Sequence, residues 1–170
     1  MNRSNQQLKT DRLLLTSLEL DDRSFILELV NSEGWLTFIG DRNVRSLEDA
    51  SAYIEKIQNE PTVTYWVVKL QNETQIGVVT LIQREYLPLP DIGFAFLPDY
   101  QGKGYAFEAC EVVLNDLRKH TDFPSILAIT NPENAGSIRL IERLGFSFDK
   151  REVQDGKDTN QYQLDFRGLY

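Results

Sequence analysis

Gln101-Gly102-Lys103-Gly104-Tyr105-Ala106 lies between a predicted strand and a predicted helix and is the most informative stretch of the chain. Glycine lets a backbone approach a ligand with no side chain in the way. The first turn of a helix presents unpaired N–H groups and a partial positive charge. The amides from Gly102 to Ala106 can therefore surround a diphosphate, with the ammonium group of Lys103 at its edge.

Two well-known nucleotide loops do not match this stretch. A dinucleotide-binding loop requires a small residue at the position of Phe107, and a triphosphate-binding loop ends in Gly-Lys-Ser/Thr, a triplet that this sequence lacks. For the bare Gly-x-Gly pattern, an ordinary turn that only begins a helix remains the alternative.

Alternating strand and helix patterns flank the loop. Strands are predicted at Arg12–Ser17, Thr64–Leu70, Gln75–Gln83, Asp91–Leu97, Ser125–Thr130, Phe146–Val153 and Asn160–Phe166. Helices are predicted at Asp21–Asn31, Ser46–Glu60, Gly104–Lys119 and Asn134–Leu144, and a loop or short turn at Gly34–Arg45. An antiparallel opening followed by strand–helix–strand–helix–strand predicts an α/β fold, a mixed sheet with helices on both faces. The length suits one domain, predicted over residues 1–170.

Three local signals refine these elements. Ser46 is predicted to cap its helix, with Asp49 in the reciprocal position of a capping box. Gly93, inside a strand, predicts either a bulge or a close approach of two backbones. Asp155-Gly156-Lys157 predicts the turn of the final hairpin.

Two blocks of the sequence, in the same order, resemble the GNAT superfamily of N-acetyltransferases. Gln101–Ala106 matches its Gln/Arg-x-x-Gly-x-Gly/Ala pattern, and Gly102–Ala109 resembles the Rim-type subgroup, which acetylates the N-termini of ribosomal proteins. Asn131–Leu140 and the following Leu144-Gly145-Phe146 are similar to that subgroup's Asn-x-x-Ser helix and Leu-Gly-Phe ending. Thr10–Leu15 resembles its first strand, so the resemblance covers nearly the whole chain.

The resemblance implies the GNAT acyl-CoA N-acyltransferase fold, with acetyl-CoA as co-substrate. In this fold two central parallel strands, here Asp91–Leu97 and Ser125–Thr130, splay apart, and the pantetheine arm pairs with the first of them like an added strand. The residues implied to bind the cofactor are Phe96 and Leu97 through their backbones, Gln101, Gly102, Lys103, Gly104, Tyr105 and Ala106 around the pyrophosphate, and Asn134 and Ser137 beside the pantetheine. Asn134 is equally suited to be a simple helix N-cap.

Catalysis requires a neutral amine, because a protonated amine cannot attack a thioester. By resemblance, Asp91 stands where relatives carry a glutamate, and we expect it to act as general base through water or to bind the substrate ammonium group. The tyrosine that commonly protonates the leaving thiolate is replaced by Ile141. Ser137 is then the candidate for orienting the sulfur or a water. A solvated aspartate and a surface serine are the alternatives.

The acceptor site is expected between the first two helices and the hairpins. Trp35, Phe38 and Tyr86 are the candidates for its lining, with core packing as the alternative for each. Arg42 and Arg45 are either ligands for a substrate carboxylate or solvated. The acceptor is predicted to be a small-molecule amine or a protein N-terminus.

Composition restricts the remaining classes. The formal net charge of −8 disfavours nucleic-acid binding and attracts cationic partners. With one cysteine, Cys110, and one histidine, His120, no internal disulfide and no metal site are expected. The polar start from Met1 to Thr10 and the lack of long apolar runs predict a cytoplasmic protein without membrane contact. A monomer and a homodimer are both open.

Two rival functions fit parts of the pattern. A noncatalytic acyl-CoA-binding regulatory module would keep the phosphate loop while Asp91 and Ser137 do nothing. An acyl-CoA hydrolase needs an activated nucleophile, and the sequence supplies none, since no histidine lies near Cys110 in the sequence.

Overall fold

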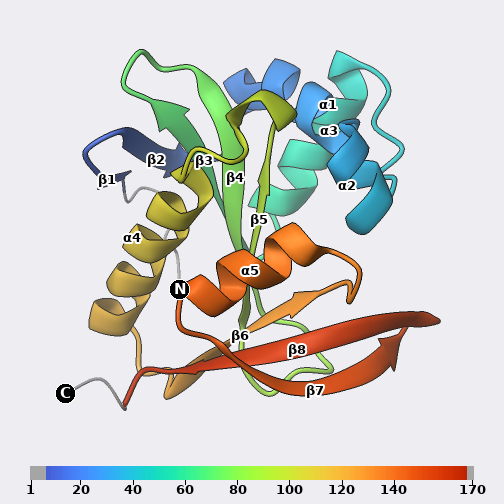
Figure 1. Ribbon diagram of the computed structural model, residues 1–170. Coiled ribbons are helices and arrows are strands. Elements are labelled where there is room, and N and C mark those ends of the chain that lie inside the picture. The colour runs from blue at the N-terminus through green and yellow to red at the C-terminus, as the bar shows by residue number, and fades with distance from the viewer. Residues whose placement is uncertain (1–6, 168–170) are drawn as a thin grey trace.

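One mixed sheet of eight strands forms the centre of the computed structural model, which describes residues 7–167 (Figure 1). The strand order is β1-β2-β3-β4-β5-β6-β8-β7. The strands are β1 (Leu8–Lys9), β2 (Leu13–Ser17), β3 (Val63–Leu70), β4 (Gln75–Ile82), β5 (Asp91–Phe96), β6 (Ser125–Thr130), β7 (Ser147–Gln154) and β8 (Lys157–Asp165). The predicted mixed sheet is confirmed, and residues 1–6 and 168–170 of the predicted single domain lie outside the described part.

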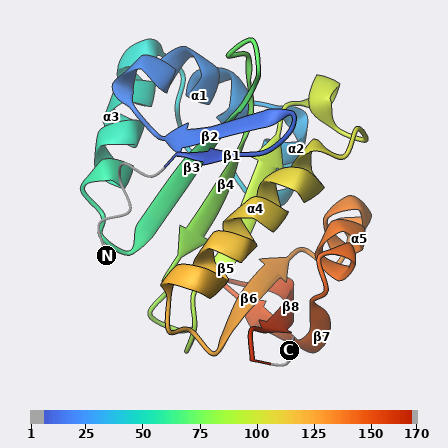
Figure 2. The same cartoon turned by 90° about the vertical axis from the view of Figure 1, so that its left-hand side faces the viewer.

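Helices cover both faces of the sheet (Figures 1 and 2). The helices are α1 (Arg23–Val30), α2 (Glu33–Phe38), α3 (Leu47–Gln58), α4 (Tyr105–His120) and α5 (Ala135–Arg143), with two short 3₁₀ turns, η1 (Leu20–Asp22) and η2 (Pro98–Tyr100). α4 and α5 pack on one face over a core that includes Leu15, Phe96 and Ile141. The first three helices pack on the other face over a core that includes Ile26 and Val67.

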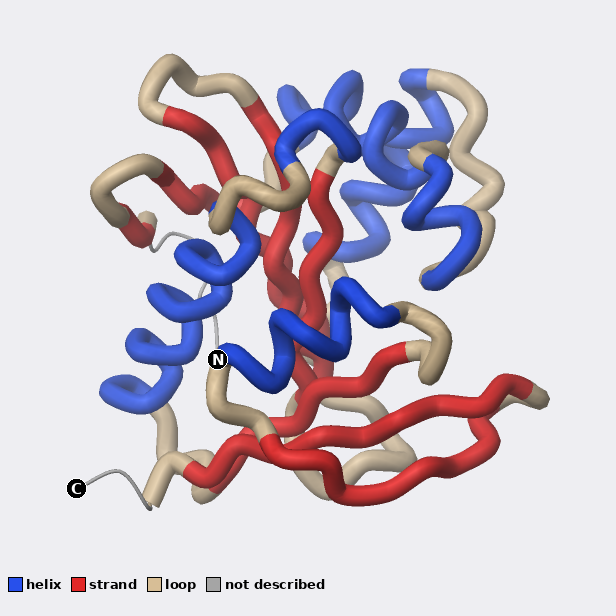
Figure 3. Tube along the Cα trace, in the orientation of Figure 1, coloured by secondary structure: helices blue, strands red, loops and turns tan. Residues whose placement is uncertain are grey.

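β5 and β6 are the parallel pair, and they stay together over a very short stretch. Their one register pair is Asp91 with Leu127, and the amide of Leu127 donates to the carbonyl of Pro90 at 3.0 Å. Beyond Asp91, β5 and β6 diverge. β6 stays paired with β8, and the strands β6, β8 and β7 run in a different direction from β5 (Figures 1 and 3). The predicted splay of the two central strands is therefore present.

Several local predictions are confirmed and others are wrong. Ser46 caps α3 by accepting a hydrogen bond from the amide of Asp49 at 3.0 Å, but the carboxylate of Asp49 accepts from the amide of Arg45 at 2.9 Å rather than from the cap residue. The register of β4 and β5 is unbroken at Gly93, so no bulge exists there; a Cβ on Gly93 would lie 2.7 Å from the hydroxyl oxygen of Thr80. The bulge alternative is thus wrong, and the space at Gly93 is limited by the side chain of Thr80 rather than by a second backbone.

The segment predicted as a loop or short turn, Gly34–Arg45, begins inside a helix. Glu33–Phe38 forms α2, because Trp35 is buried against the α1–α3 core and holds this turn in place. Strand β1 was also not predicted, since two residues are too few to show an alternating pattern. None of the described helices has the length and hydropathy needed to cross a bilayer.

Candidate active site

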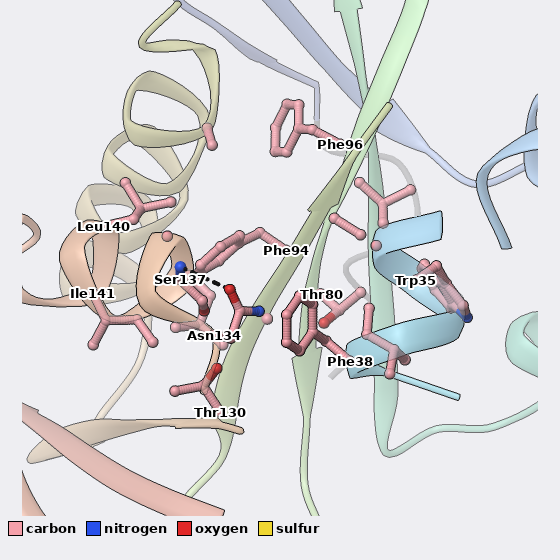
Figure 4. Close-up of a pocket in the computed structure, with 18 of the residues that line it drawn as sticks. Trp35, Phe38, Thr80, Phe94, Phe96, Thr130, Asn134, Ser137, Leu140 and Ile141 are labelled. Carbon is pink, nitrogen blue, oxygen red and sulfur yellow. Dashed lines mark hydrogen bonds between the residues drawn. The ribbon is translucent and has the colours of Figure 1, made fainter. Parts of the chain in front are cut away.

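A cleft of about 710 Å³ lies where β5 separates from β6, and it reaches both faces of the sheet. The α5 side of the cleft is lined by the loop before α4, the first turn of α4 and one side of α5 along its length. The α2 side is lined by α2, the loop after it and the facing residues of strands β3, β4 and β5. Figure 4 shows Asn134 and Ser137 on one side of the strands and Trp35 and Phe38 on the other.

The predicted phosphate loop lies on the α5 side. Gly102 has a φ of 73° and Gly104 a φ of 82°, values that L side chains rarely adopt, which explains both glycines. Gly104 is the N-cap of α4, and no side chain caps this helix. The amides of its first turn therefore face the exposed loop without a side-chain partner, as an anion site requires. Lys103 is exposed and does not line the cleft.

A residue that sequence reasoning left without a role, Arg12, holds this loop from the turn that precedes β2. Its Nη1 donates to the carbonyl oxygen of Lys103 at 3.0 Å, and its Nε donates to Glu108 of α4 at 3.2 Å. Its guanidinium also lies 4.5 Å from the centroid of the Tyr105 ring. The hydroxyl of Thr10 donates to the other carboxylate oxygen of Glu108 at 2.8 Å. Arg12 belongs to the Thr10–Leu15 stretch that carried the resemblance, but only the tertiary structure shows what its side chain contacts.

The backbone of β5 offers hydrogen-bonding groups to the gap at one of the two predicted positions. The amide of Leu97 donates to the carbonyl oxygen of Ile76 in β4 at 2.9 Å, so this amide faces away from the gap. The carbonyl oxygen of Leu97 accepts from the amide of Tyr100 at 3.0 Å. Leu97 also does not line the cleft, so the geometry gives its predicted role as a cofactor contact no support. Strand alternation instead turns the backbone groups of Phe94 and Phe96 toward the gap.

Gln101 serves β5 as well as the loop. Its side-chain nitrogen donates to the carbonyl of Phe96 at 3.0 Å, which satisfies that oxygen. Gln101 still lines the cleft with Gly102. The fixed glutamine of the motif therefore ties the loop to the strand, a role that the pattern alone does not reveal.

The start of α5 brings Asn134 and Ser137 to the cleft. The side-chain oxygen of Asn134 accepts from the amide of Ser137 at 3.2 Å, so Asn134 caps the helix. Its amide nitrogen lies on the cleft side of that bond (Figure 4). Both predicted roles are therefore geometrically compatible, since capping uses the oxygen and leaves the N–H₂ group. Ile141 is 2% exposed and contributes an apolar wall to the cleft.

Asp91 lies at the base of the gap on the α2 side and is paired with an arginine. Its carboxylate accepts from Nε of Arg84 at 2.7 Å and from Nη2 at 3.4 Å. The residue is 2% exposed. Burial raises the pKa of Asp91 above its usual value, although the adjacent guanidinium of Arg84 opposes that shift. Sequence reasoning did not predict Arg84 as the partner of Asp91, because no local pattern indicates that these two residues, seven positions apart, form an ion pair.

Two of the three predicted acceptor residues line the α2 side. Trp35 is buried and Phe38 is partly exposed, and both line the cleft. Tyr86 is 55% exposed and lies outside the cleft lining, so that prediction is not supported. Tyr65 lines this side too, and its hydroxyl lies 3.1 Å from that of Tyr53.

Cys110 is fully buried in the α4 core, and burial raises the pKa of its thiol far above the usual range. A neutral, inaccessible thiol is a poor nucleophile, so its predicted packing role is confirmed. His120 lies at the C-terminal end of α4, and its Nδ1 is 2.9 Å from a carboxylate oxygen of Asp116, also outside the cleft.

Comparisons with known proteins give a consistent result. Residues 12–147 match the acetyltransferase (GNAT) domain. An uncharacterized N-acetyltransferase of Bacillus subtilis, YnaD, is 27% identical over 154 residues, covering 89% of this chain and 90% of that protein. The spermidine N(1)-acetyltransferase of Escherichia coli K12 is 21% identical over 150 residues, covering 88% of this chain and 80% of that protein. A structure of the ribosomal L7/L12 alpha-N-protein acetyltransferase RimL with coenzyme A superposes with a TM-score of 0.82 at 17% identity, covering 94% and 98% of the two chains.

Proposed function

The chain belongs to the GNAT acetyltransferase family, and we propose that this acetyl-CoA-dependent enzyme acetylates a primary amine by direct attack within a ternary complex. The observation that carries the proposal is the cleft that passes through the sheet where β5 leaves β6. Direct attack requires thioester and amine to meet, and a gap in the sheet lets ligands bound on opposite faces do so.

The α5 side supplies a chain of contacts suited to coenzyme A. The amides at the start of α4 would bind the pyrophosphate, helped by the partial positive charge of that helix terminus. The backbone groups of Phe94 and the amide of Phe96, which face the gap, would pair with the amide groups of the pantetheine arm. The side-chain nitrogen of Asn134 would donate to the same arm while its oxygen caps α5.

The catalytic groups come from both sides of the cleft. We assign Asp91 as the acceptor of the amine proton through a water molecule, since burial makes its carboxylate a stronger base than a solvated aspartate. A carboxylate has room for several hydrogen bonds, so the bond to Arg84 leaves lone pairs on Asp91 for that water. Ser137, on the opposite side, would orient the leaving sulfur or a second water, because Ile141 cannot donate a proton.

An amine acceptor is supported by the names of the relatives. One is a spermidine acetyltransferase and another modifies the N-terminus of a ribosomal protein. The nucleophile in both is a primary amine, and the α2 side of this cleft has an aromatic lining that can hold the body of such a molecule.

Calorimetry with acetyl-CoA and a thiol-release assay over a broad amine panel test the proposal together. Binding in the micromolar range plus acceptor-dependent thiol release is the expected result. Binding without release from any amine would instead favour the noncatalytic acyl-CoA-binding module, and absence of binding at millimolar acetyl-CoA would exclude both.

A further inference from the structure

The cleft has a charge opposite to that of the whole protein. The chain carries a formal net charge of −8, yet the charged residues of the cleft lining, within the described part of the chain, are four arginines and one acid. The lining arginines are Arg42, Arg84, Arg139 and Arg143, and the acid is Asp91. Such a local reversal is a feature of the site rather than of the surface as a whole.

The one acid of the lining is already neutralised. Asp91 forms an ion pair with Arg84 through two nitrogens, at 2.7 and 3.4 Å. An acceptor with a second ammonium group, such as a polyamine, therefore finds no unpaired carboxylate among the described residues of the lining. Burying that second charge without a partner would cost binding energy.

Two of the arginines belong to the α5 side. Arg139 and Arg143 both lie on α5, and the guanidinium of Arg143 is 4.6 Å from the centroid of the Phe107 ring. This is the side with the phosphate loop. The charged groups available to an acceptor on the α2 side are consequently Arg42 and the Arg84–Asp91 ion pair.

Arg42 is the other arginine that lines the α2 side of the cleft. It lies in the loop after α2, where the neighbouring Arg45 is engaged by Asp41 and by the side chain of Asn31. Arg42 itself has no hydrogen bond or ion pair with the described residues. Both Arg42 and Arg84 act to lower the pKa of Tyr65 against the burial that raises it, which places the two cations around the same wall of the cleft.

We propose that the acceptor is a small amine that also carries a carboxylate, and that Arg42 binds this carboxylate at the mouth of the α2 side. Trp35 and Phe38 then pack against the part of the molecule between the amine and the carboxylate. An arginine is suited to this task because its planar guanidinium binds a carboxylate through two parallel hydrogen bonds. The inference rests on the proposed acetyl transfer and narrows its substrate class.

The test uses the purified chain with acetyl-CoA and acceptors in matched pairs. Short α- and ω-amino carboxylates and aromatic amino acids are each compared with their primary amides, and spermidine and a peptide with a free N-terminus complete the panel. Values of kcat/KM are corrected for the fraction of neutral amine. At least one carboxylate should exceed its amide by about tenfold or more, the usual strength of a charge-assisted hydrogen bond.

Arg42→Gln should bring that ratio close to one, mainly through a higher KM for the carboxylate. The matched control is Arg23→Gln, which alters an exposed arginine on α1, outside the cleft lining, and should leave the ratio unchanged. Higher kcat/KM for spermidine, an amide or the peptide than for every carboxylate would overturn the inference while acetyl transfer stands. A carboxylate preference that Arg42→Gln does not alter would also overturn it, and acetyl-CoA binding without any turnover would remove both the inference and the proposed function.

Discussion

The two sides of the cleft differ in how their binding groups are made. On the α5 side, the groups expected to bind are largely backbone groups from the start of α4 and from β5, with the side chains of Asn134 and Ser137 beside them. On the α2 side, they are side chains from α2, the following loop and three strands. A site made of backbone groups depends on local conformation, which a short motif can encode. A site made of distant side chains depends on packing, and it can change without altering the fold.

Gly104→Glu should break the α5 side most completely. The new residue would be strained at a φ of 82°, its Cβ would lie 3.3 Å from Arg12, and its carboxylate would repel a diphosphate. We expect calorimetry to show a loss of about a hundredfold or more in acetyl-CoA affinity. Gly156→Glu is the control, because Gly156 has a φ of 76° in the β7–β8 hairpin with open space around it. Equal losses in both variants would mean that strain, not the site, is responsible.

Asp91→Asn tests the α2 side by removing a base while keeping a similar shape. We expect kcat/KM to fall about a hundredfold. In the parent enzyme, kcat/KM corrected for the fraction of neutral amine should decrease as the pH falls through the pKa of Asp91, which burial raises, because the protonated carboxyl cannot accept the amine proton. This acidic limb of the pH profile should disappear in Asp91→Asn.

Asp22→Asn is the control for that variant. Asp22 is also buried, burial also raises its pKa, and it lies outside the cleft lining, bonded to Gln75. Its replacement should alter the melting temperature without altering the pH profile. An Asp91→Asn enzyme with the parent's profile would assign Asp91 to structure, as the partner of Arg84.

Arg12→Gln tests whether the phosphate loop needs its brace. The substitution removes the bonds to Lys103 and Glu108 and the contact with Tyr105, so the loop should lose order before the cofactor binds. We expect KM for acetyl-CoA to rise about tenfold, with kcat little changed. Arg151→Gln, which removes a comparable bond to Asn160 in the hairpin, should leave KM for acetyl-CoA as it is. A fall in kcat alone would contradict a positioning role.

Asn134→Asp separates the two functions of one side chain and should have the smallest effect. Aspartate caps a helix as well as asparagine does, so the melting temperature should not change. It lacks the N–H₂ group, so affinity for acetyl-CoA should fall about fivefold. Asn134→Ala, by contrast, should lose both affinity and about 1 kcal/mol of stability. Unchanged affinity in both variants would leave Asn134 as a cap only.

The predictions for Leu97 and Tyr86 depended on features of the fold that the sequence does not show. Phe96 and Leu97 are adjacent in the sequence, yet strand alternation turns the backbone of one to the gap and the other to β4. The sequence pattern identified the strand that borders the gap but not which of its residues turn their backbone groups toward the gap. Tyr86 was a candidate for the acceptor lining, and only the path of the turn after β4 places it outside the cleft lining.

The sequence by itself determined the mixed α/β sheet, the phosphate loop and the capped α5 helix, because glycines, caps and alternating apolar residues act over a few neighbouring positions. Only the tertiary structure decided that Arg12 holds the loop, that Arg84 neutralises Asp91 and that Arg42 has no hydrogen bond or ion pair within residues 7–167. These outcomes depend on which side chains meet across elements that are far apart in the chain. Charge pairing is a property of distances in the folded protein, and it decides what kind of acceptor the α2 side can hold.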